Sequence, residues 1–249
     1  MKIALIGFGK MGREVERIVK EGEKHQIVSV SFEKREDLPA GRQACLDTKG
    51  IKKADVAIDF TAPGVILSNI SAISKIGTNL VIGTTGWYDE LEKVKKIAAK
   101  YKTGIIYGSN FSIGANVFFQ VVKVASERFA LFPQYDVYGI ETHHSGKKDS
   151  PSGTAKTLGR IILANSKTKK VFQNERVNRQ ITPSELHFSS VRGGANPGRH
   201  EIVFDSAADE IRLIHQAHGR QGFAQGAIMA AEYIKDKKGL YRFEELFVK

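Results

Sequence analysis

The fold is decided by the stretch Lys2-Ile3-Ala4-Leu5-Ile6-Gly7-Phe8-Gly9-Lys10-Met11-Gly12-Arg13-Glu14-Val15. A short apolar run, fit for a buried parallel strand, leads directly into Gly-x-Gly-x-x-Gly and then into an amphipathic helix. In this context Gly7 permits a tight turn, Gly9 lets the backbone approach a pyrophosphate, and Gly12 lets helix and strand pack closely. The stretch therefore predicts a nicotinamide or flavin dinucleotide site, with contacts from Gly7, Phe8, Gly9, Lys10, Met11 and Gly12.

A second predicted strand, residues 27–32, ends at Glu33, about 20 residues past Gly12, where an acid meets the adenosine ribose. Glu33 would accept hydrogen bonds from the ribose hydroxyls of NADH, whereas Lys34 beside it would hold the extra phosphate of NADPH. We expect the protein to use both NADH and NADPH, with a modest preference. The alternative is that Glu33, Lys34 and Arg35 are solvated loop charges.

Strands and helices then alternate, which predicts a right-handed parallel α/β sheet. The expected strands cover 56–61, 79–82 and 104–107, and the expected helices cover 63–75 and 89–100. The carboxyl ends of such strands meet at one sheet edge, where open α/β sheets bind ligands. Further cofactor contacts are expected there from Gly83, Thr84, Thr85, Gly108, Ser109, Asn110 and Phe111, although the glycine turn at 83–86 alone could be an ordinary strand–helix connection.

From residue 113 the pattern changes to an α+β arrangement. It predicts helices at 116–132 and 154–164 and strands at 136–140, 185–192, 200–205 and 210–217. One face of this second sheet would be free to pair with other subunits. A final helix, 222–235, is expected to pack on the first domain. The predicted fold class is therefore α/β: a Rossmann-type parallel-sheet nucleotide domain (1–112 and 221–249) and an α+β substrate and oligomerisation domain (113–220).

The segment from Glu141 to Ala155, between the predicted strand and the next helix, concentrates groups for proton transfer and anion binding. It holds His143, His144 and Lys147, followed by the helix start Ser152-Gly153-Thr154. Imidazoles and an ammonium can donate protons, and the first amides of a helix can hold a carboxylate. The segment predicts a site that binds a small anionic molecule and transfers a proton to it. A solvated polar turn is the alternative for any one of these residues, and a packing role is the alternative for His144.

Composition excludes several classes of protein. The 249 residues carry a formal charge of +11, but the basic residues are scattered and no nucleic-acid motif accompanies them, so we expect no nucleic-acid partner. No stretch has the roughly 20 apolar residues needed to cross a bilayer, so we expect no membrane partner and a cytoplasmic location. The single cysteine, Cys45, fits a reducing compartment. No metal is expected, because no Cys/His spacing suits zinc.

With these motifs placed, the chain resembles the dihydrodipicolinate reductase family over nearly its whole length. The matching elements are the glycine loop, Asp59-Phe60-Thr61, Gly83-Thr84-Thr85-Gly86, Asn110-Phe111-Ser112-Ile113-Gly114, the run from Glu141 to Ala155, Arg192-Gly193-Gly194, Gly198-Arg199-His200-Glu201, and His215 to Ala227. The run with the paired histidines is highly specific, whereas the glycine loop is shared by many dehydrogenases.

The resemblance implies an NAD(P)H-dependent reductase that converts 4-hydroxy-tetrahydrodipicolinate, a cyclic dicarboxylate, to tetrahydrodipicolinate in diaminopimelate and lysine biosynthesis. It also implies a homotetramer built on the second sheets. By similarity, His143 is a proton donor or acceptor and Lys147 a proton donor, while His144, Gly153 and Thr154 contact substrate. A further set of cations, Arg192, His200, His215 and Arg220, could form a basic wall, and some of them are expected to be structural.

Two other functions stay open at this point. A different small-molecule Rossmann dehydrogenase would share the glycine loop but lack the element that joins His143 and His144 to Ser152-Gly153-Thr154. A non-catalytic nucleotide-sensing protein would show loss of His143 or Lys147, and both residues are present.

The end of the second strand yields a test of cofactor choice. A charge-assisted hydrogen bond contributes about 1.5–3 kcal/mol, which is roughly 10- to 150-fold in affinity. Lys34→Ala should weaken NADPH binding by that factor and leave NADH binding unchanged, and Glu33→Ala should do the reverse; fluorescence titration measures both. Equal loss of both cofactors in each variant would indicate a structural role, and no change in either would indicate solvated charges.

Overall fold

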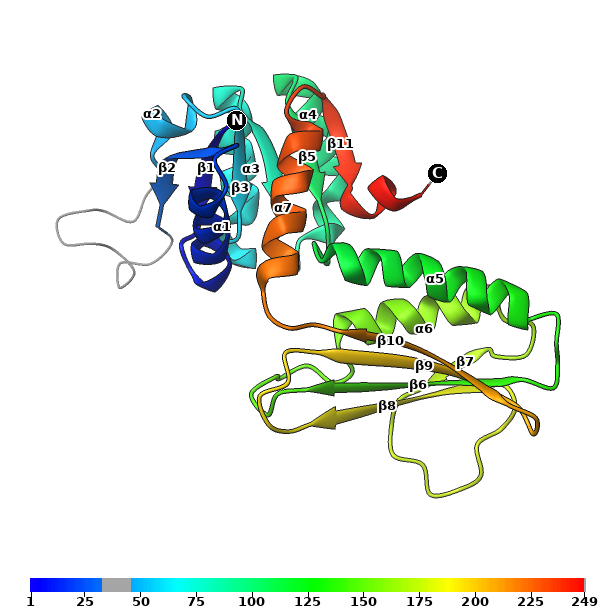
Figure 1. Ribbon diagram of the computed structural model, residues 1–249. Helices are drawn as coiled ribbons and strands as arrows, with labels where there is room; N and C mark the ends of the chain where they lie inside the picture. The colour runs from blue at the N-terminus through cyan, green and yellow to red at the C-terminus, as the bar shows by residue number, and fades with distance from the viewer. Residues whose placement is uncertain (33–45, 249) are drawn as a thin grey trace. The chain divides into compact units, whose positions relative to one another are not determined.

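A computed structural model describes residues 1–32 and 46–248, so the predicted ribose contacts Glu33 and Lys34 lie outside the described residues. The chain divides into two units (Figure 1). The first combines Met1–Ile113 with Arg220–Lys249, and the second is the continuous segment Gly114–Gly219. The chain therefore leaves the first unit after its fifth strand and returns to complete it.

The first unit is built on a six-stranded parallel sheet, as the alternating pattern predicts. Its strand order is β11-β5-β4-β3-β1-β2. The order changes direction between β1 and β3, and ligands bind at such a switch point in open α/β sheets. The short strand β11 was not predicted. The strands are β1 (Lys2–Ile6), β2 (Gln26–Ser31), β3 (Val56–Asp59), β4 (Asn79–Ile82), β5 (Gly104–Tyr107) and β11 (Gly239–Arg242).

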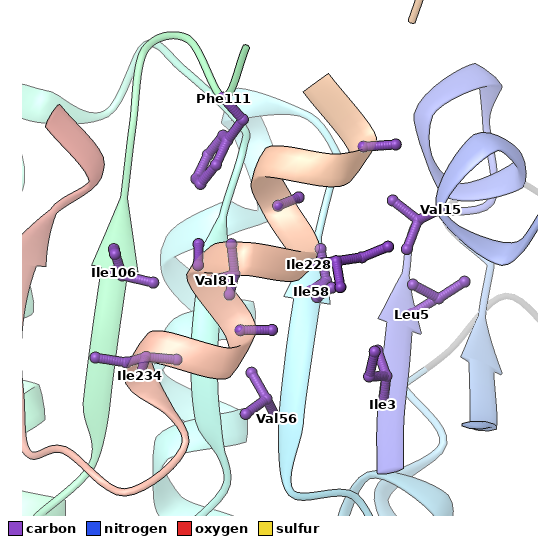
Figure 2. Packing of buried hydrophobic residues seen from close by; sticks show 14 of the residues in the cluster. Ile3, Leu5, Val15, Val56, Ile58, Val81, Ile106, Phe111, Ile228 and Ile234 are labelled. Carbon is purple, nitrogen blue, oxygen red and sulfur yellow. The ribbon is translucent and has the colours of Figure 1, made fainter. Parts of the chain in front are cut away.

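Helices cover both faces of this sheet, which explains why β3 and β4 are buried throughout. Side chains of α1 and α7 pack on one face with Leu5, Ile58 and Val81, as Figure 2 shows. Side chains of α3 and α4 pack on the other face with Ile6 and Leu80. The helical elements of this unit are α1 (Lys10–Glu21), α2 (Thr48–Ile51), α3 (Pro63–Ile76), η2 (Tyr88–Glu90), α4 (Leu91–Tyr101), α7 (Gln221–Ile234) and η3 (Phe243–Phe247).

The second unit is a mixed five-stranded sheet of order β10-β9-β6-β8-β7, with two helices on one face (Figure 1). Leu158 on the second of these helices packs in one buried cluster with Phe188 and Ile202 on the sheet. No described helix of this unit packs on the opposite face. The elements are α5 (Ile113–Phe129), β6 (Asp136–His143), α6 (Gly153–Asn165), β7 (Val171–Gln173), β8 (Glu185–Arg192), β9 (Arg199–Asp205) and β10 (Glu210–Gln216).

Strand β6 is longer than the predicted strand 136–140, because it continues to His143. Its burial alternates, with Val137, Gly139, Glu141 and His143 facing the helices. His143 is therefore a strand residue on the covered face rather than a loop residue. Among the described residues, no helix has both the length and the apolar character needed to cross a membrane.

The buried carboxamide of Asn79, at the start of β4, binds the end of α7 in the C-terminal part of the first unit. Its Nδ2 donates to the carbonyl oxygens of Ile234 (2.7 Å) and Lys235 (2.8 Å) at the end of α7, and its Oδ1 accepts from the amide of Gly104 (2.7 Å). The side chain thus satisfies helix-terminal carbonyls that lack intrahelical donors.

We expect Asn79→Ala to lower the free energy of unfolding by about 1–3 kcal/mol, because the buried Gly104 amide loses its acceptor. Urea denaturation followed by circular dichroism measures the change. The matched control is Asn165→Ala, whose carboxamide donates to Ile161 within the same helix and to no other described residue, and which should cost no more than about 0.5 kcal/mol. Equal stabilities for the two variants would contradict this role of Asn79.

Candidate functional site

The glycine loop follows β1 and begins α1. Gly7 has a φ of 85°, in the left-handed region, and a Cβ on Gly12 would lie 2.3 Å from the Gly7 carbonyl oxygen. Gly9 is the N-cap of α1 and is exposed, and no described residue lies within 4 Å of the position where its Cβ would be. Lys10 is exposed beside it. This open helix start fits a pyrophosphate, which the helix amides would hold.

Phe60, immediately after β3, joins three of the predicted cofactor motifs. A Cβ on Gly83 would lie 2.0 Å from its ring, and a Cβ on Gly7 would lie 2.8 Å from its carbonyl oxygen. The ring of Phe111 packs edge-on against it at 6.2 Å between centroids. The ends of β1, β3, β4 and β5 therefore pack around one aromatic residue, which requires glycine at both close approaches.

Asp59 ends β3 at the predicted edge, but its side chain is buried within the first unit. Its carboxylate is fully buried and accepts from the amide and hydroxyl of Thr61 (2.8 and 2.6 Å) and from Nδ2 of Asn69 (2.9 Å). These contacts fix the turn after β3.

The other predicted cofactor residues differ in the solvent exposure of their side chains. Phe8 and Met11 are half-buried, and Arg13 lies 5.1 Å from the centre of the Phe8 ring. Thr85 and Ser109 are exposed, and Ser109 donates to Glu244. Buried positions are Thr84, Gly108 and Phe111, whereas Gly83 and Asn110 are half-buried.

In the second unit, the register of four strands builds a row of polar side chains on the helix-covered face. Glu141 of β6 pairs with His200 of β9 on one side and Ser190 of β8 on the other, and His200 pairs with His215 of β10. Two residues after Glu141 on the same strand, His143 pairs with Arg192 of β8. Because side chains two residues apart share a face, Glu141 and His143 lie next to each other on β6.

The Glu141 carboxylate is the centre of this row and has no exposed surface. Its Oε1 accepts from the Ser190 hydroxyl (2.7 Å), from Arg192 Nη2 (2.8 Å) and from the Ser152 amide (2.9 Å). Burial acts to raise the pKa of Glu141, but polar contacts with His200, Ser152, Arg192 and Ser190 outweigh it and hold that pKa well below the usual range. The carboxylate is therefore ionised at neutral pH.

His143 is almost completely buried beside this carboxylate. Its Nδ1 lies 3.3 Å from Glu141 Oε2, and its ring packs edge-on to that of His200 at 5.1 Å between centroids. Burial is the main cause that lowers the pKa of His143 to about 4, and the charges of His200, Lys147 and Arg192 add to it, while Glu141 opposes the shift. The imidazole is therefore neutral at pH 7 in the unliganded chain.

The segment after His143 is anchored by backbone contacts. The amide of His144 donates to the Asn196 carbonyl (2.7 Å), and Arg192 donates to the carbonyl of Asp149 (2.8 Å). Lys147, partly exposed, pairs through its Nζ with an Asp149 carboxylate oxygen at 2.7 Å. The ammonium is held in one region yet remains accessible.

Helix α6 starts where the sequence predicts an anion-binding helix end. Ser152 is its N-cap and accepts from the Ala155 amide (3.1 Å). Gly153, the first helical residue, is exposed, and no described residue approaches its Cβ position within 4 Å. Thr154 follows and is half-buried. An anion can therefore approach this helix start closely.

Glu141, His143 and His200 each offer one atom that could ligate a metal ion, and these three atoms lie within 4.8 Å of one another. Two of these residues already have other partners, because Arg192 neutralises the carboxylate at Oε1 and His200 Nε2 lies 3.1 Å from the Ser152 hydroxyl. We interpret the cluster as a buried polar network beside the His143 imidazole.

The predicted basic wall is only partly assembled. Arg192 and His200 contact Glu141, and the ring of His215 lies 6.4 Å from that of His200, but Arg220 is the N-cap of α7 in the other unit. The sequence pattern alone gives Glu141 no role. Its spacing of two residues from His143 on a strand is the signal that could have identified it.

Comparisons with known proteins agree along the chain. Residues 1–111 match the family described as "Dihydrodipicolinate reductase, N-terminus", and residues 114–247 match "Dihydrodipicolinate reductase, C-terminus". A 4-hydroxy-tetrahydrodipicolinate reductase of Christiangramia forsetii is 37% identical over 99% of this chain and 97% of its own. The enzyme of that name from Rickettsia bellii is also 37% identical, over 96% of this chain and 91% of its own.

A solved structure resembles the whole chain as well. Dipicolinate-bound dihydrodipicolinate reductase from Paenisporosarcina sp. TG-14 superposes with a TM-score of 0.79 at 28% identity, and the match covers 99% of each chain.

The burial of His143 gives a measurable pH dependence. We expect its ring to titrate with a midpoint of about 4 in the unliganded protein, well below the roughly 6.5 of a solvated histidine, so that it gains a proton only as the pH falls through that region. Histidine resonances followed by NMR between pH 3.5 and 8 report the midpoint, and His143→Ala identifies the signal. A midpoint near 6.5 would contradict the predicted environment.

Proposed function

The chain belongs to the dihydrodipicolinate reductase family, and on that basis we propose how its residues carry out the reaction. It is an NAD(P)H-dependent oxidoreductase that reduces 4-hydroxy-tetrahydrodipicolinate in diaminopimelate and lysine biosynthesis. The observation that carries the assignment of roles is the arrangement of His143, Lys147 and the α6 start within one unit.

The first unit would hold the cofactor. The open start of α1 at Gly9 and Lys10 would bind the pyrophosphate, and the exposed Thr85 and Ser109 would contact the nicotinamide half. Gly7, Phe8, Met11, Gly12, Gly83, Thr84, Gly108, Asn110 and Phe111 would shape the edge, with the buried Phe111 side chain acting through packing. When bound, the nicotinamide supplies a hydride. Use of both NADH and NADPH stays a proposal that depends on Glu33 and Lys34.

The start of α6 would hold the dicarboxylate substrate. Gly153 offers open backbone at the positive end of the helix dipole, and Thr154 adds a hydroxyl. His144, half-buried and anchored through its amide to Asn196, would contact a second polar group of the ring. A bound carboxylate near His143 would favour the imidazolium, because an opposite charge stabilises the charged form.

His143 and Lys147 would supply the proton that completes the reduction. Addition of hydride leaves a carbanion or enamine in the ring, and a nearby N–H must protonate it. The ammonium of Lys147 carries a proton next to Asp149, and His143 becomes able to donate once the dicarboxylate raises its pKa. Both groups would therefore act on the same bound ring.

We also propose a cytoplasmic homotetramer that assembles through the uncovered face of the second sheet. Val191 and Ile214 are 49% and 47% exposed, and the register places both on that face. Glu201 is paired there with Arg199 (2.9 Å) and Arg212 (2.6 Å). An apolar sheet face with its charges already paired is suited to packing against a second copy.

The roles in proton transfer can be tested by substitution. A general acid contributes about 100- to 10,000-fold, so His143→Ala and Lys147→Ala should lower kcat by that order while NADH binding, measured by fluorescence, stays near wild type. The assay follows NAD(P)H absorbance with substrate generated by a coupled synthase. Lys148→Ala changes an exposed neighbouring charge and should keep wild-type turnover. Wild-type turnover in either of the first two variants would remove that role.

Substitution at the α6 start tests the anion site. Gly153→Val puts a side chain where a carboxylate must reach the backbone, so KM should rise and dipicolinate binding should weaken by roughly 10- to 150-fold, with NADH affinity kept. Gly64→Val, at the second residue of α3, is an equally open helix-start glycine and should leave dipicolinate binding unchanged. Binding of dipicolinate no tighter than that of a pyridine monocarboxylate would contradict the proposed pocket.

A further inference from the structure

We infer that Glu141 is a positioning residue that holds the His143 ring with its hydrogen on Nδ1, so that Nε2 is the nitrogen that exchanges a proton with the substrate. The inference deepens the proposed function, since it specifies which atom of His143 acts. It rests on the geometry around two buried atoms, Glu141 Oε2 and His143 Nδ1.

These two atoms depend on each other. Both are buried, they lie 3.3 Å apart, and within the described part of the chain neither has a hydrogen-bond partner. The other carboxylate oxygen, Oε1, is fully engaged by Ser152, Ser190 and Arg192, which fixes the orientation of the carboxyl group. Oε2 is therefore directed at the histidines and has little freedom to turn away.

The neighbouring His200 is less dependent on the carboxylate. Its Nε2 lies 3.5 Å from Oε2 but also lies 3.1 Å from the Ser152 hydroxyl, which gives it another partner. Among the described residues, Nδ1 of His143 has no such second partner. The carboxylate thus determines the state of the His143 ring more than that of His200.

An ionised carboxylate can only accept hydrogen bonds, so the hydrogen of a neutral His143 must lie on Nδ1. The opposite nitrogen, Nε2, faces the backbone of Gly198, where a Cβ would lie only 3.0 Å away. The absence of a side chain at Gly198 leaves room beside Nε2. A ring that carries its hydrogen on Nδ1 exchanges its proton at Nε2, as in other histidines oriented by a buried acid.

Groups from several elements determine how readily Nε2 is protonated. Glu141 on the same strand favours the imidazolium, whereas His200 on β9, Arg192 on β8 and Lys147 after β6 oppose it. The negative charge of Glu141 is therefore the one contribution among these residues that keeps His143 able to take up a proton.

The experiment reads the tautomer directly from long-range ¹H–¹⁵N spectra of full-length protein labelled with ¹⁵N-histidine at pH 7. In the wild type we expect the His143 hydrogen on Nδ1. In Glu141→Gln the amide oxygen can keep the three donors at Oε1, and the NH₂ group replaces Oε2 and donates to Nδ1, which moves the hydrogen to Nε2. Glu141→Asp retains an acceptor and should preserve the wild-type tautomer.

Kinetics give a second readout. Glu141→Gln should lower kcat by about 10- to 100-fold, the range for residues that orient a functional imidazole, while the dissociation constants of NADH and dipicolinate change by less than about 3-fold. In the background of His143→Ala the same substitution should have little further effect, because both act through one group. Glu185→Gln removes another buried carboxylate, one that binds Arg179 at the far end of β8, and should alter neither tautomer nor kcat.

A hydrogen on Nε2 in the wild type, or an unchanged tautomer in Glu141→Gln, would overturn the inference. This holds even if Glu141→Gln folds poorly, since the wild-type spectrum needs no variant. The proposed function fails by a different result, namely full turnover by His143→Ala. A multiplicative loss in the double variant would indicate that Glu141 acts only by supporting the fold.

Discussion

The polar site of the second unit depends on one ion pair, between the fully buried carboxylate of Glu141 and the partly buried guanidinium of Arg192. A buried carboxylate without a partner would be strongly unfavourable, and removing one member of such a pair leaves an uncompensated charge. Here the guanidinium donates at 2.8 Å, and the Ser190 hydroxyl and the Ser152 amide complete the coordination of the same oxygen. Since Ser152 is also the N-cap of α6, the carboxylate joins the imidazole of His143 to the helix start proposed to bind substrate. The proposed proton-transfer group and the proposed anion-binding group are thus parts of a single network.

Local signals in the sequence were sufficient for features that depend on neighbouring residues. The run from Ile3 to Gly12 encodes a strand, a turn and a helix start within ten residues, and Ser152 marks the start of α6 by the ordinary chemistry of an N-cap. The strands of the parallel sheet except β11, and those of the second sheet except β7, were predicted for the same reason. The predicted end of β6 was wrong. Glu141 and His143 are polar and were assigned to the following loop, but the burial of the strand alternates as far as His143.

Features that depend on register between distant strands could not be predicted. Glu141 meets His200 and Ser190 only because β6 pairs with β9 and β8 in one particular alignment, and nothing within any one segment specifies it. The same limit applies to Asp59, since its sequence context does not show that the carboxylate accepts hydrogen bonds from Thr61 and Asn69. Close packing around Phe60 is likewise visible only in three dimensions, where it accounts for glycine at both Gly7 and Gly83.

The division of the chain also constrains the order in which its parts can fold during synthesis. The second unit is continuous, so residues 114–219 can form their sheet and helices as soon as they emerge from the ribosome. The first unit cannot be completed until residues 220–247 have been made, because α7 covers one sheet face and β11 forms its edge beside β5. Until then Val81 and Ile106 lack their cover, and the edge of β5 is unpaired. The nucleotide unit, although begun first, is therefore finished last, and a nascent chain stalled before α7 would display an apolar, unpaired sheet to chaperones.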